Sequence, residues 1–414
     1  MNRRRFLGTS LGALAAILAA GALPGAVYAA RGAKVSKAAP VSRLAVVFLR
    51  GGLDALSALP PYDDPLYLKA RPTLAVPGPG KPGGCVDLGD GLGMHPALAP
   101  LEPYWRDGRL AFIESCGFTD APQDHEGARR LFEEGDPSGK SKSGWMNRLQ
   151  NALGPVKGAP AISFSPKRPL ILKGPLWTRN YLTRGKTALP AGDGLAIYQA
   201  AQTLYQDGAM AKTFASAREL RTKRLAAFSR EMEEASGGAC APGDFPGAVK
   251  DLLEQWKRYP GSRLAFLEAG GFDLHYGERE ALAGSLSGAA RGLADLAQGL
   301  GDGLAHTVIA VVSEFGRTAV ENAFGGTDNG YGGCMLLLGG PVGGGRVYGQ
   351  SPELTRLSLR DGRDIPVDVD VREAFSEICA NHFRLDEKGL EAVFPGYERQ
   401  GGLEGLIARE EAAP

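Results

Sequence analysis

The sequence predicts an α/β fold with a mainly parallel central sheet that helices cover on both faces. Six brief apolar segments bounded by glycine or polar residues are predicted to be strands: 44–49, 110–114, 161–164, 264–267, 308–312 and 335–338. They do not alternate apolar with polar residues, which indicates strands buried on both faces, as in parallel sheets. Helical patterns lie between them, and strands that alternate with helices are typical of α/β domains.

The clearest predicted helix covers residues 278–300. Its leucines recur at helical spacing and give it one apolar face: Leu282, Leu286, Leu293, Leu296 and Leu300. Residues 192–236 and 246–258 are predicted to form a long, charged helical insertion, at about 190–260, on one edge of the domain. Strands and helices together are expected to form a single domain over residues 43–405, followed by a tail at 406–414.

The N-terminus has the features of a twin-arginine export signal. Arg3, Arg4 and Arg5 precede an uncharged run from Phe6 to about Leu23, and small residues follow. We expect residues 1–29 to be a signal peptide cleaved after Ala29, and residues 30–42 to be a linker. The alternative is an uncleaved anchor, since the run approaches the roughly 20 residues that span a bilayer.

An export signal predicts an exported protein, periplasmic or extracellular, whose partner during export is the twin-arginine translocase. After cleavage no stable membrane anchor is expected, because no second apolar run is long enough to span a bilayer. Residues 1–29 carry three arginines and no acid, so 44 basic and 46 acidic residues remain of the chain's 47 and 46. This balance gives no basis for binding nucleic acid.

Carboxylates and a histidine follow three of the predicted strands. Asp54 comes after 44–49, Asp273 and His275 after 264–267, and Glu314 after 308–312. The carboxyl ends of parallel strands share one sheet edge, so these side chains are expected to converge there. They suit a divalent metal such as zinc, manganese or magnesium. The alternatives are a helix N-cap for Asp54 and a plain ion pair between Glu314 and Arg317.

Several motifs resemble the exported bacterial proteins of the domain-of-unknown-function 1501 family, which is related in fold to the alkaline phosphatase and sulfatase superfamily. The motifs stand in order over most of the chain after the signal: Phe48–Asp54, Gly93–Leu98, Gly144–Arg148, Gly270–His275, Ser313–Thr318 and Gly326–Asp328. The resemblance implies an alkaline-phosphatase-like fold. It also implies that Asp54, Asp273, His275 and Glu314 hold a metal, with Asp328 and Asn329 nearby.

The sequence departs from the family pattern at two places. Asp124-His125-Glu126 stands where the family usually has Ser-His-Phe, at the position where the superfamily carries its nucleophile. Gly326-Thr327-Asp328-Asn329-Gly330 replaces Gly-Thr-Asp-His-Gly, so an expected histidine ligand is an asparagine. The candidate catalytic residues that remain are Asp124 and Arg317, the latter to meet an anion.

Two functions follow from this pattern. The departures favour a degenerate metal site in a non-catalytic protein with a binding or envelope-assembly role. The alternative is a metal-dependent hydrolase of phosphate or sulfate esters, in which a missing hydroxyl would leave only direct attack by water.

Overall fold

The predicted strands form one large sheet in the computed structural model, which describes residues 40–119, 121–183, 185, 189–190 and 209–408. The predicted signal peptide, residues 30–39 of the linker, residues 192–208 of the insertion and residues 409–414 of the tail lie outside the described residues. From Pro40 onward the chain forms one compact unit.

The described residues contain a nine-stranded sheet, in which all six predicted strands are present. Along the sheet the order is β10-β4-β9-β8-β1-β7-β5-β6, and β11 pairs with β4. The strands are β1 (Arg43–Leu49), β4 (Leu110–Gly117), β5 (Ala161–Ser165), β6 (Thr178–Leu182), β7 (Leu264–Ala269), β8 (Thr307–Val312), β9 (Gly333–Gly339), β10 (Arg346–Tyr348) and β11 (Val369–Asp370). Only β9 runs antiparallel to its neighbours β4 and β8, so the sheet is mixed but mostly parallel, which confirms the α/β prediction.

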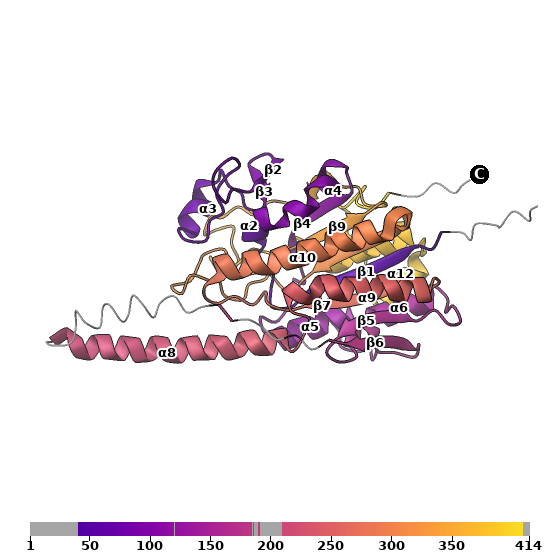
Figure 1. Ribbon diagram of the computed structural model, residues 1–414, viewed down its shortest axis with the longest axis horizontal. Helices are drawn as coiled ribbons and strands as arrows, with labels where there is room; N and C mark the ends of the chain where they lie inside the picture. The colour runs from indigo at the N-terminus through magenta and orange to yellow at the C-terminus, as the bar shows by residue number, and fades with distance from the viewer. Residues whose placement is uncertain (1–39, 120, 184, 186–188, 191–208, 409–414) are drawn as a thin grey trace, which may run out of the picture. The chain divides into compact units, whose positions relative to one another are not determined.

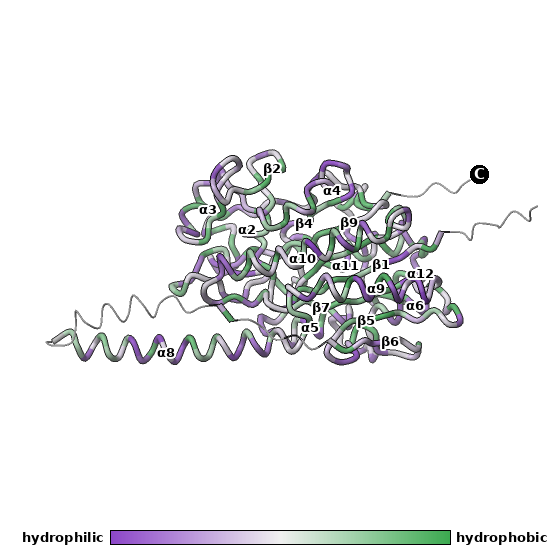
Figure 2. Tube along the Cα trace, viewed as in Figure 1, coloured by the Kyte–Doolittle hydropathy of each residue, from purple (hydrophilic) through white to green (hydrophobic). Residues whose placement is uncertain are grey.

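Helices cover both faces of this sheet (Figure 1). Successive side chains of a strand point to opposite faces, so Ala45, Val47 and Leu49 of β1 enter one core and Leu44, Val46 and Phe48 the other. On the first face lie α9 (Phe245–Arg258) and α10 (Glu278–Leu300). On the second lie α5 (His125–Glu134), α6 (Trp145–Ala152), α11 (Val371–Glu377) and α12 (Glu387–Val393). Hydrophobic residues accordingly gather in the strands and on the helix faces against them (Figure 2).

Helix α10 has the bounds that its leucine pattern predicts. Leu282, Leu286, Leu293 and Leu296 are buried against the sheet, and Leu300 is partly buried at the end. Each leucine side chain removed from water stabilises the fold by about 1.5–3 kcal/mol, so this stripe fixes the helix on the sheet.

The predicted insertion contains α8 (Ala209–Ser236), which packs on the sheet only through its C-terminal part. Phe228, Met232 and Ala235 are buried there, whereas Met210 and Leu220 are exposed. Figure 1 shows the helix extending beyond the strands. This arrangement brings the last turns of α8 to the carboxyl edge of the sheet.

The remaining elements are short. A separate antiparallel pair consists of β2 (Val86–Gly89) and β3 (Leu92–Met94). The short helices are α2 (Ala55–Ala58), α3 (Pro65–Ala70), η1 (Pro96–Leu101), α4 (Glu102–Arg106), η2 (Leu170–Leu172), η3 (Pro242–Asp244), η4 (Gly301–His306) and η5 (Ile378–His382). Within the described part of the chain, no helix has both the length and the apolar character needed to cross a membrane.

Candidate metal centre

The carboxyl ends of β1, β7 and β8 lie side by side. Strand β1 pairs in parallel with both others, with Leu49 opposite Ala269 and Phe48 opposite Val312. The loops after these strands approach very closely, because a Cβ on Gly51 would lie 2.0 Å from the Asp273 backbone nitrogen. Gly51 has φ of +123°, which side chains rarely permit, and its N–H donates to Glu314 Oε1 at 2.8 Å. The glycine pair after β1 therefore lets the three loops form one site.

His125 enters this site from the start of α5. Asp124 caps the helix by accepting a hydrogen bond from the Gly127 N–H at 2.7 Å, which fixes His125 as the first helical residue. The His125 Nδ1 atom lies 2.9 Å from Glu314 Oε1, and its Nε2 atom lies 3.4 Å from Asp273 Oδ2. The imidazole is thus held between carboxylates from two different strand ends.

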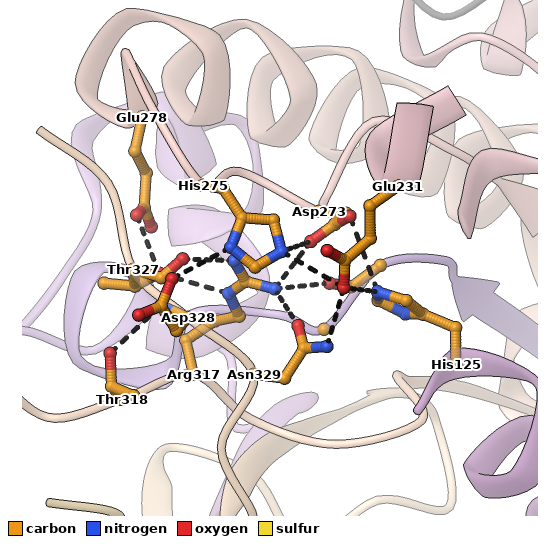
Figure 3. A network of polar contacts seen from close by, with 12 residues as sticks. His125, Glu231, Asp273, His275, Glu278, Arg317, Thr318, Thr327, Asp328 and Asn329 are labelled. Atoms are coloured by element: carbon orange, nitrogen blue, oxygen red, sulfur yellow. Dashed lines mark hydrogen bonds and ion pairs between the residues drawn. The ribbon is translucent and has the colours of Figure 1, made fainter. Parts of the chain in front are cut away.

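Glu231 reaches the same point from α8, across from the strand loops (Figure 3). Its Oε1 atom lies 3.9 Å from His125 Nε2 and 3.5 Å from His275 Nε2. Its side chain is 42% exposed, whereas that of Asp273 is fully buried, so Glu231 closes the site from the solvent side. Ligand atoms of His125, Glu231 and Asp273 all lie within 4.8 Å of one another, and we call these three residues the central cluster.

The central cluster fits a divalent metal. Three buried atoms that face it make no well-formed hydrogen bond: His125 Nε2, Asp273 Oδ2 and His275 Nε2. They do lie at ion-pair distance, with His125 Nε2 3.4 Å from Asp273 Oδ2 and His275 Nε2 3.1 Å from Asp273 Oδ1. Two ligand atoms about 2.1 Å from one tetrahedral ion lie about 3.4 Å apart. The spacings of 3.4 Å from His125 to Asp273 and 3.5 Å from His275 to Glu231 match that value, and the 3.9 Å from His125 to Glu231 is longer. Imidazole nitrogen with carboxylate oxygen is a donor set that suits zinc or manganese.

Electrostatics favours charged forms of these groups. Burial alone would lower the pKa of His125, but the carboxylates of Asp273 and Glu314 outweigh it and raise the pKa to about 9. For His275, burial is likewise outweighed by Asp273, Asp328 and Glu231, and the pKa rises to about 10. Burial would raise the pKa of Asp273, yet the Arg317 charge and the two histidines lower it. A metal ion would therefore compete with protons on the imidazoles, so its affinity would increase with pH.

The Arg317 guanidinium group holds the Asp273 carboxylate in position. The Arg317 Nη1 atom donates to Asp273 Oδ1 at 2.7 Å and to Asn329 Oδ1 at 2.6 Å, and Nε donates to the Thr327 hydroxyl at 3.1 Å. The side chain is only 1% exposed. A guanidinium held by these protein acceptors positions Asp273, and the structure does not place it where it meets an external anion.

The structure brings three of the four predicted ligand residues together and places Asp54 elsewhere. Asp273, His275 and Glu314 lie in one network through His125. The Asp54 carboxylate is bound by both terminal nitrogens of Arg71, with Nη2 to Oδ1 at 2.8 Å. Arg71 is fully buried directly after α3, and Asp54 is not among the residues of the central cluster.

Asp54 connects to the site indirectly, through Glu278. Burial would raise the pKa of Asp54, but the Arg71 charge lowers it, so the carboxylate is ionised. Burial and the Asp54 charge then raise the pKa of Glu278 to about 8, which keeps that acid protonated near neutral pH. Glu278 Oε2 in turn accepts a hydrogen bond from the Thr327 hydroxyl at 2.8 Å. Asp54 and Glu278 can both be buried near Arg71 because only Asp54 is ionised and its charge is balanced by the arginine.

The residues at the two motif departures lie beside the cluster. Asp124 is exposed, its carboxylate caps α5, and it lines the cavity beside the central cluster, which its neighbour His125 joins. The Asn329 amide donates to Glu231 Oε1 at 3.3 Å and to the Gln123 carbonyl at 3.0 Å. Asp328 Oδ1 lies 3.0 Å from His275 Nδ1 and orients that ring. Residue 329 therefore does face the site.

Sequence reasoning gave no role to His125 or Glu231. The signal for His125 was the histidine that the Asp124-His125-Glu126 segment shares with the Ser-His-Phe motif. Glu231 had no local signal, because it is one of many charged residues on a long helix and only the packing of α8 brings it to the site.

A cavity of about 1120 Å³ opens beside the central cluster. His125 and Glu231 line one part of it, and Arg50, Glu133 and Glu268 line another. The segment between β5 and β6 forms a further wall. Its lining is strongly charged, which favours a polar ligand over an apolar one.

The buried carboxyl of Glu133 predicts a specific pH dependence of stability. Burial, together with the negative charge of Glu268, raises its pKa from 4.5 to about 7. Because the pKa of Glu133 is higher in the folded than in the unfolded state, its proton stabilises the fold. This contribution to the free energy of unfolding is complete below about pH 4.5 and is lost as pH rises through 7. The loss amounts to about 3 kcal/mol. Urea unfolding of Glu133→Gln, which cannot ionise, should lack it.

The exposed neighbour Glu126 on the same helix provides the control for that measurement. Glu126→Gln should follow the wild-type change in unfolding free energy between pH 4.5 and 8. If Glu133→Gln and wild type changed equally over this range, the buried proton would not be on Glu133.

The fold and the site define an α/β protein with histidine and carboxylate groups gathered at the carboxyl edge of its sheet. Residues 118–394, more than half of the chain, match the family described as "Protein of unknown function (DUF1501)", and the chain belongs to this family. The family resemblance of the motifs is thereby confirmed. The matched range contains the whole central cluster but neither Asp54 nor Arg71. No curated protein matches the chain.

Solved structures similar to this chain have low sequence identity to it. Ps i-CgsB in complex with k-i-k-neocarrahexaose is 9% identical at a TM-score of 0.43, with 85% of this chain and 74% of that chain covered. The C-terminal periplasmic domain of EcEptC from Escherichia coli in complex with Zn is 10% identical at 0.37, with 72% and 73% covered. A protein in the alkaline phosphatase superfamily from Vibrio parahaemolyticus is 8% identical at 0.36, with 72% and 60% covered. At these TM-scores the likenesses carry no information on the chemistry of the site.

Proposed function

We propose that this protein is an exported divalent-metal protein that binds a ligand at its metal and has no covalent catalytic cycle. His125, Glu231 and Asp273 would hold the ion, with His275 as a further nitrogen donor. The observation that carries the proposal is the convergence of three buried atoms that contact one another as ion pairs but make no well-formed hydrogen bond: His125 Nε2, Asp273 Oδ2 and His275 Nε2. Zinc or manganese fits this donor set better than magnesium, because imidazole ligates them well.

When bound, the ion would supply Lewis acidity and a positive charge for an oxygen atom of the ligand. The protein's own groups do the remaining work. Arg317 keeps the Asp273 carboxylate ionised and oriented, and Asp328 orients the His275 ring through Nδ1. Glu231, 42% exposed on α8, lies on the solvent side of the cluster.

The hydroxyl groups of Ser313 and Thr327 are engaged in hydrogen bonds within the fold. The Ser313 hydroxyl accepts from the Gly52 and Leu53 N–H groups and donates to the Leu49 carbonyl. The Thr327 hydroxyl donates to Glu278 and accepts from Arg317. Asp124, at the position expected for a hydroxyl, caps α5. The Ser313 and Thr327 hydroxyls already make hydrogen bonds within the fold, and this supports a binding role for the site.

Hydrolysis of a phosphate or sulfate ester by direct attack of water is the second candidate. The observation that favours it is the cavity of about 1120 Å³ beside His125 and Glu231, which has room for a substrate. Turnover of p-nitrophenyl phosphate and p-nitrocatechol sulfate, with zinc or manganese added and with chelator, separates the two candidates. The binding proposal expects no turnover above that of Glu231→Gln. Saturable, metal-dependent turnover by the wild type alone would replace it with the hydrolase.

Export is part of the proposal and rests on Arg4 and Arg5, which precede the uncharged run of the predicted signal. The translocase recognises the paired guanidinium groups as an address, so replacing both by lysine should leave the precursor in the cytoplasm. Cell fractionation and immunoblotting measure this. Mature protein still found outside the cytoplasm in the double variant would show that another export route is used.

A further inference from the structure

We propose that the cavity beside the central cluster contains a separate subsite for an anionic oxygen group, with Arg50 at its base and Lys167 and Lys173 at its rim. The subsite rests on the proposed function, in that it names the ligand class for the same cavity. The ligand would be an extended molecule that carries a sulfate, phosphate or carboxylate group away from its metal-facing end.

Arg50 is a buried cation with unused hydrogen-bonding capacity. It follows β1 directly, lines the cavity and is only 6% exposed. Its Nη1 atom lies 3.5 Å from Glu268 Oε1, while its buried Nε atom has no hydrogen-bond partner. A Cβ on Gly237 would lie 2.6 Å from Arg50 Nη2, so the absence of a side chain there makes room for the guanidinium. The Nε atom is closed to solvent, so a ligand oxygen in the cavity would be bound by the terminal nitrogens, for which the structure shows only the ion pair with Glu268.

Two arginines, Arg50 and Arg129, line the cavity next to two glutamates. Glu268 accepts a hydrogen bond from the Ser165 hydroxyl and forms the ion pair with Arg50. Arg129 lies 3.6 Å from Glu133, whose pKa is raised by burial to about 7. Two guanidinium groups therefore lie beside the carboxyl groups of Glu268 and Glu133, and burial favours the protonated form of Glu133. An anionic group of a ligand would pair with these guanidinium groups.

The charged residues of the wall formed by residues 165–173 are all basic. Lys167, Arg168 and Lys173 line the cavity from this segment, and it contributes no acidic residue. Both lysines are exposed, and neither has an ion-pair partner among the described residues. The acids that line the cavity come from other segments, chiefly α5 and α8, where Arg129 and Arg130 pair with glutamates one turn on. Lys167 and Lys173 therefore add positive charge to the cavity without an ion pair among the described residues to balance it.

Pyrenetetrasulfonate tests this subsite, because it is fluorescent, polyanionic and not hydrolysed. Its Kd is measured at low salt on full-length mature protein treated with EDTA, so that no metal contributes. Lys167→Gln/Lys173→Gln should weaken binding about 10-fold, as expected for two partly exposed charge contacts. The matched control is Lys157→Gln/Lys250→Gln, which makes the same charge change at exposed positions outside the cavity lining. It should leave the Kd within about 2-fold.

Competition then distinguishes the possible groups. Sodium sulfate, sodium phosphate and sodium acetate are each titrated against the bound probe, and displacement by one at lower concentration identifies the preferred group. An equal Kd for wild type and the Lys167/Lys173 variant, an equal loss in the control, or no competition by any anion would overturn the subsite. If no metal binds but the lysines still govern probe affinity, the subsite stands and the metal proposal fails.

Discussion

Replacing Glu231 by glutamine is expected to lower the affinity for zinc and manganese about 100-fold, because it removes one of three ligands from the central cluster. The substitution is conservative. The side chain is 42% exposed on α8, and the glutamine oxygen can still accept the hydrogen bond from the Asn329 amide. The metal-free fold should therefore be retained, so the loss can be assigned to ligation. Isothermal titration calorimetry of EDTA-treated protein measures it directly.

Glu234 is the matched control, since it lies on the same helix, lines the same cavity and is exposed, but is not in the cluster. Glu234→Gln removes the same charge and should change metal affinity by less than about 3-fold. Equal losses in the two variants would mean that the cavity attracts cations only by its general charge. No loss in Glu231→Gln would remove α8 from the metal site.

The converse variant adds a ligand. Asn329 contacts the Glu231 carboxylate, so a histidine at this position would place an imidazole beside the central cluster. We expect Asn329→His to raise zinc affinity about 10-fold, because zinc binds imidazole strongly. The same calorimetry measures it. Unchanged affinity would mean that the ring cannot turn from Arg317, which the asparagine oxygen now contacts at 2.6 Å, toward the ion.

Replacing Arg71 by methionine should destabilise the protein by about 3–5 kcal/mol, because it leaves the buried Asp54 carboxylate without a countercharge. Arg71 is fully buried and donates to Asp54, to Ser57 Oγ at 3.1 Å, and to the carbonyls of Thr318 and Ala319 at 2.8 and 2.9 Å. It therefore ties the loop after α3 to the segment that follows Arg317. Equilibrium urea unfolding of the metal-free protein measures the change.

The exposed Lys69, at the end of α3, is the control, and Lys69→Met should alter the unfolding free energy by less than about 0.5 kcal/mol. In the double variant Arg71→Met/Asp54→Asn the loss should be smaller than the sum of the single losses, because the two charges interact. Asp54→Asn should also keep metal affinity within about 3-fold of wild type. A loss of affinity like that of Glu231→Gln would instead make Asp54 a ligand.

The sheet could be predicted because its strands carry their own signals. Continuous apolar runs ended by glycine identified β1, β7 and β8, and the rule for parallel strands placed Asp273, His275 and Glu314 at one edge. The leucine stripe of α10 fixed that helix at both ends. Short strands such as β6 and β11 have no such run, and their pairing depends on neighbours already in place.

The site was less predictable because its ligands come from packing over long distances. Asp54 ends a buried strand as Asp273 does, yet only the folded chain brings Arg71 to it. Glu231 reaches the cluster from an insertion whose pattern indicates no more than a charged helix. Arg317 is predictable as a neighbour of Glu314, but the structure pairs it with Asp273 instead. Local sequence patterns predict the helices and strands, whereas the ion pairs between side chains depend on which helices, strands and loops pack together in the fold.

Anomalous X-ray diffraction from crystals soaked in zinc or manganese tests the metal site most directly. We predict one strong anomalous peak about 2.0–2.3 Å from His125 Nε2, Asp273 Oδ2 and a Glu231 oxygen, with His275 Nε2 beside the peak. The peak should be absent in crystals of Glu231→Gln soaked at the same concentration. Two results would contradict a metal site at the central cluster. One is a metal bound at Asp54, in the place that Arg71 now occupies, and the other is metal elsewhere in the protein with no peak at the cluster.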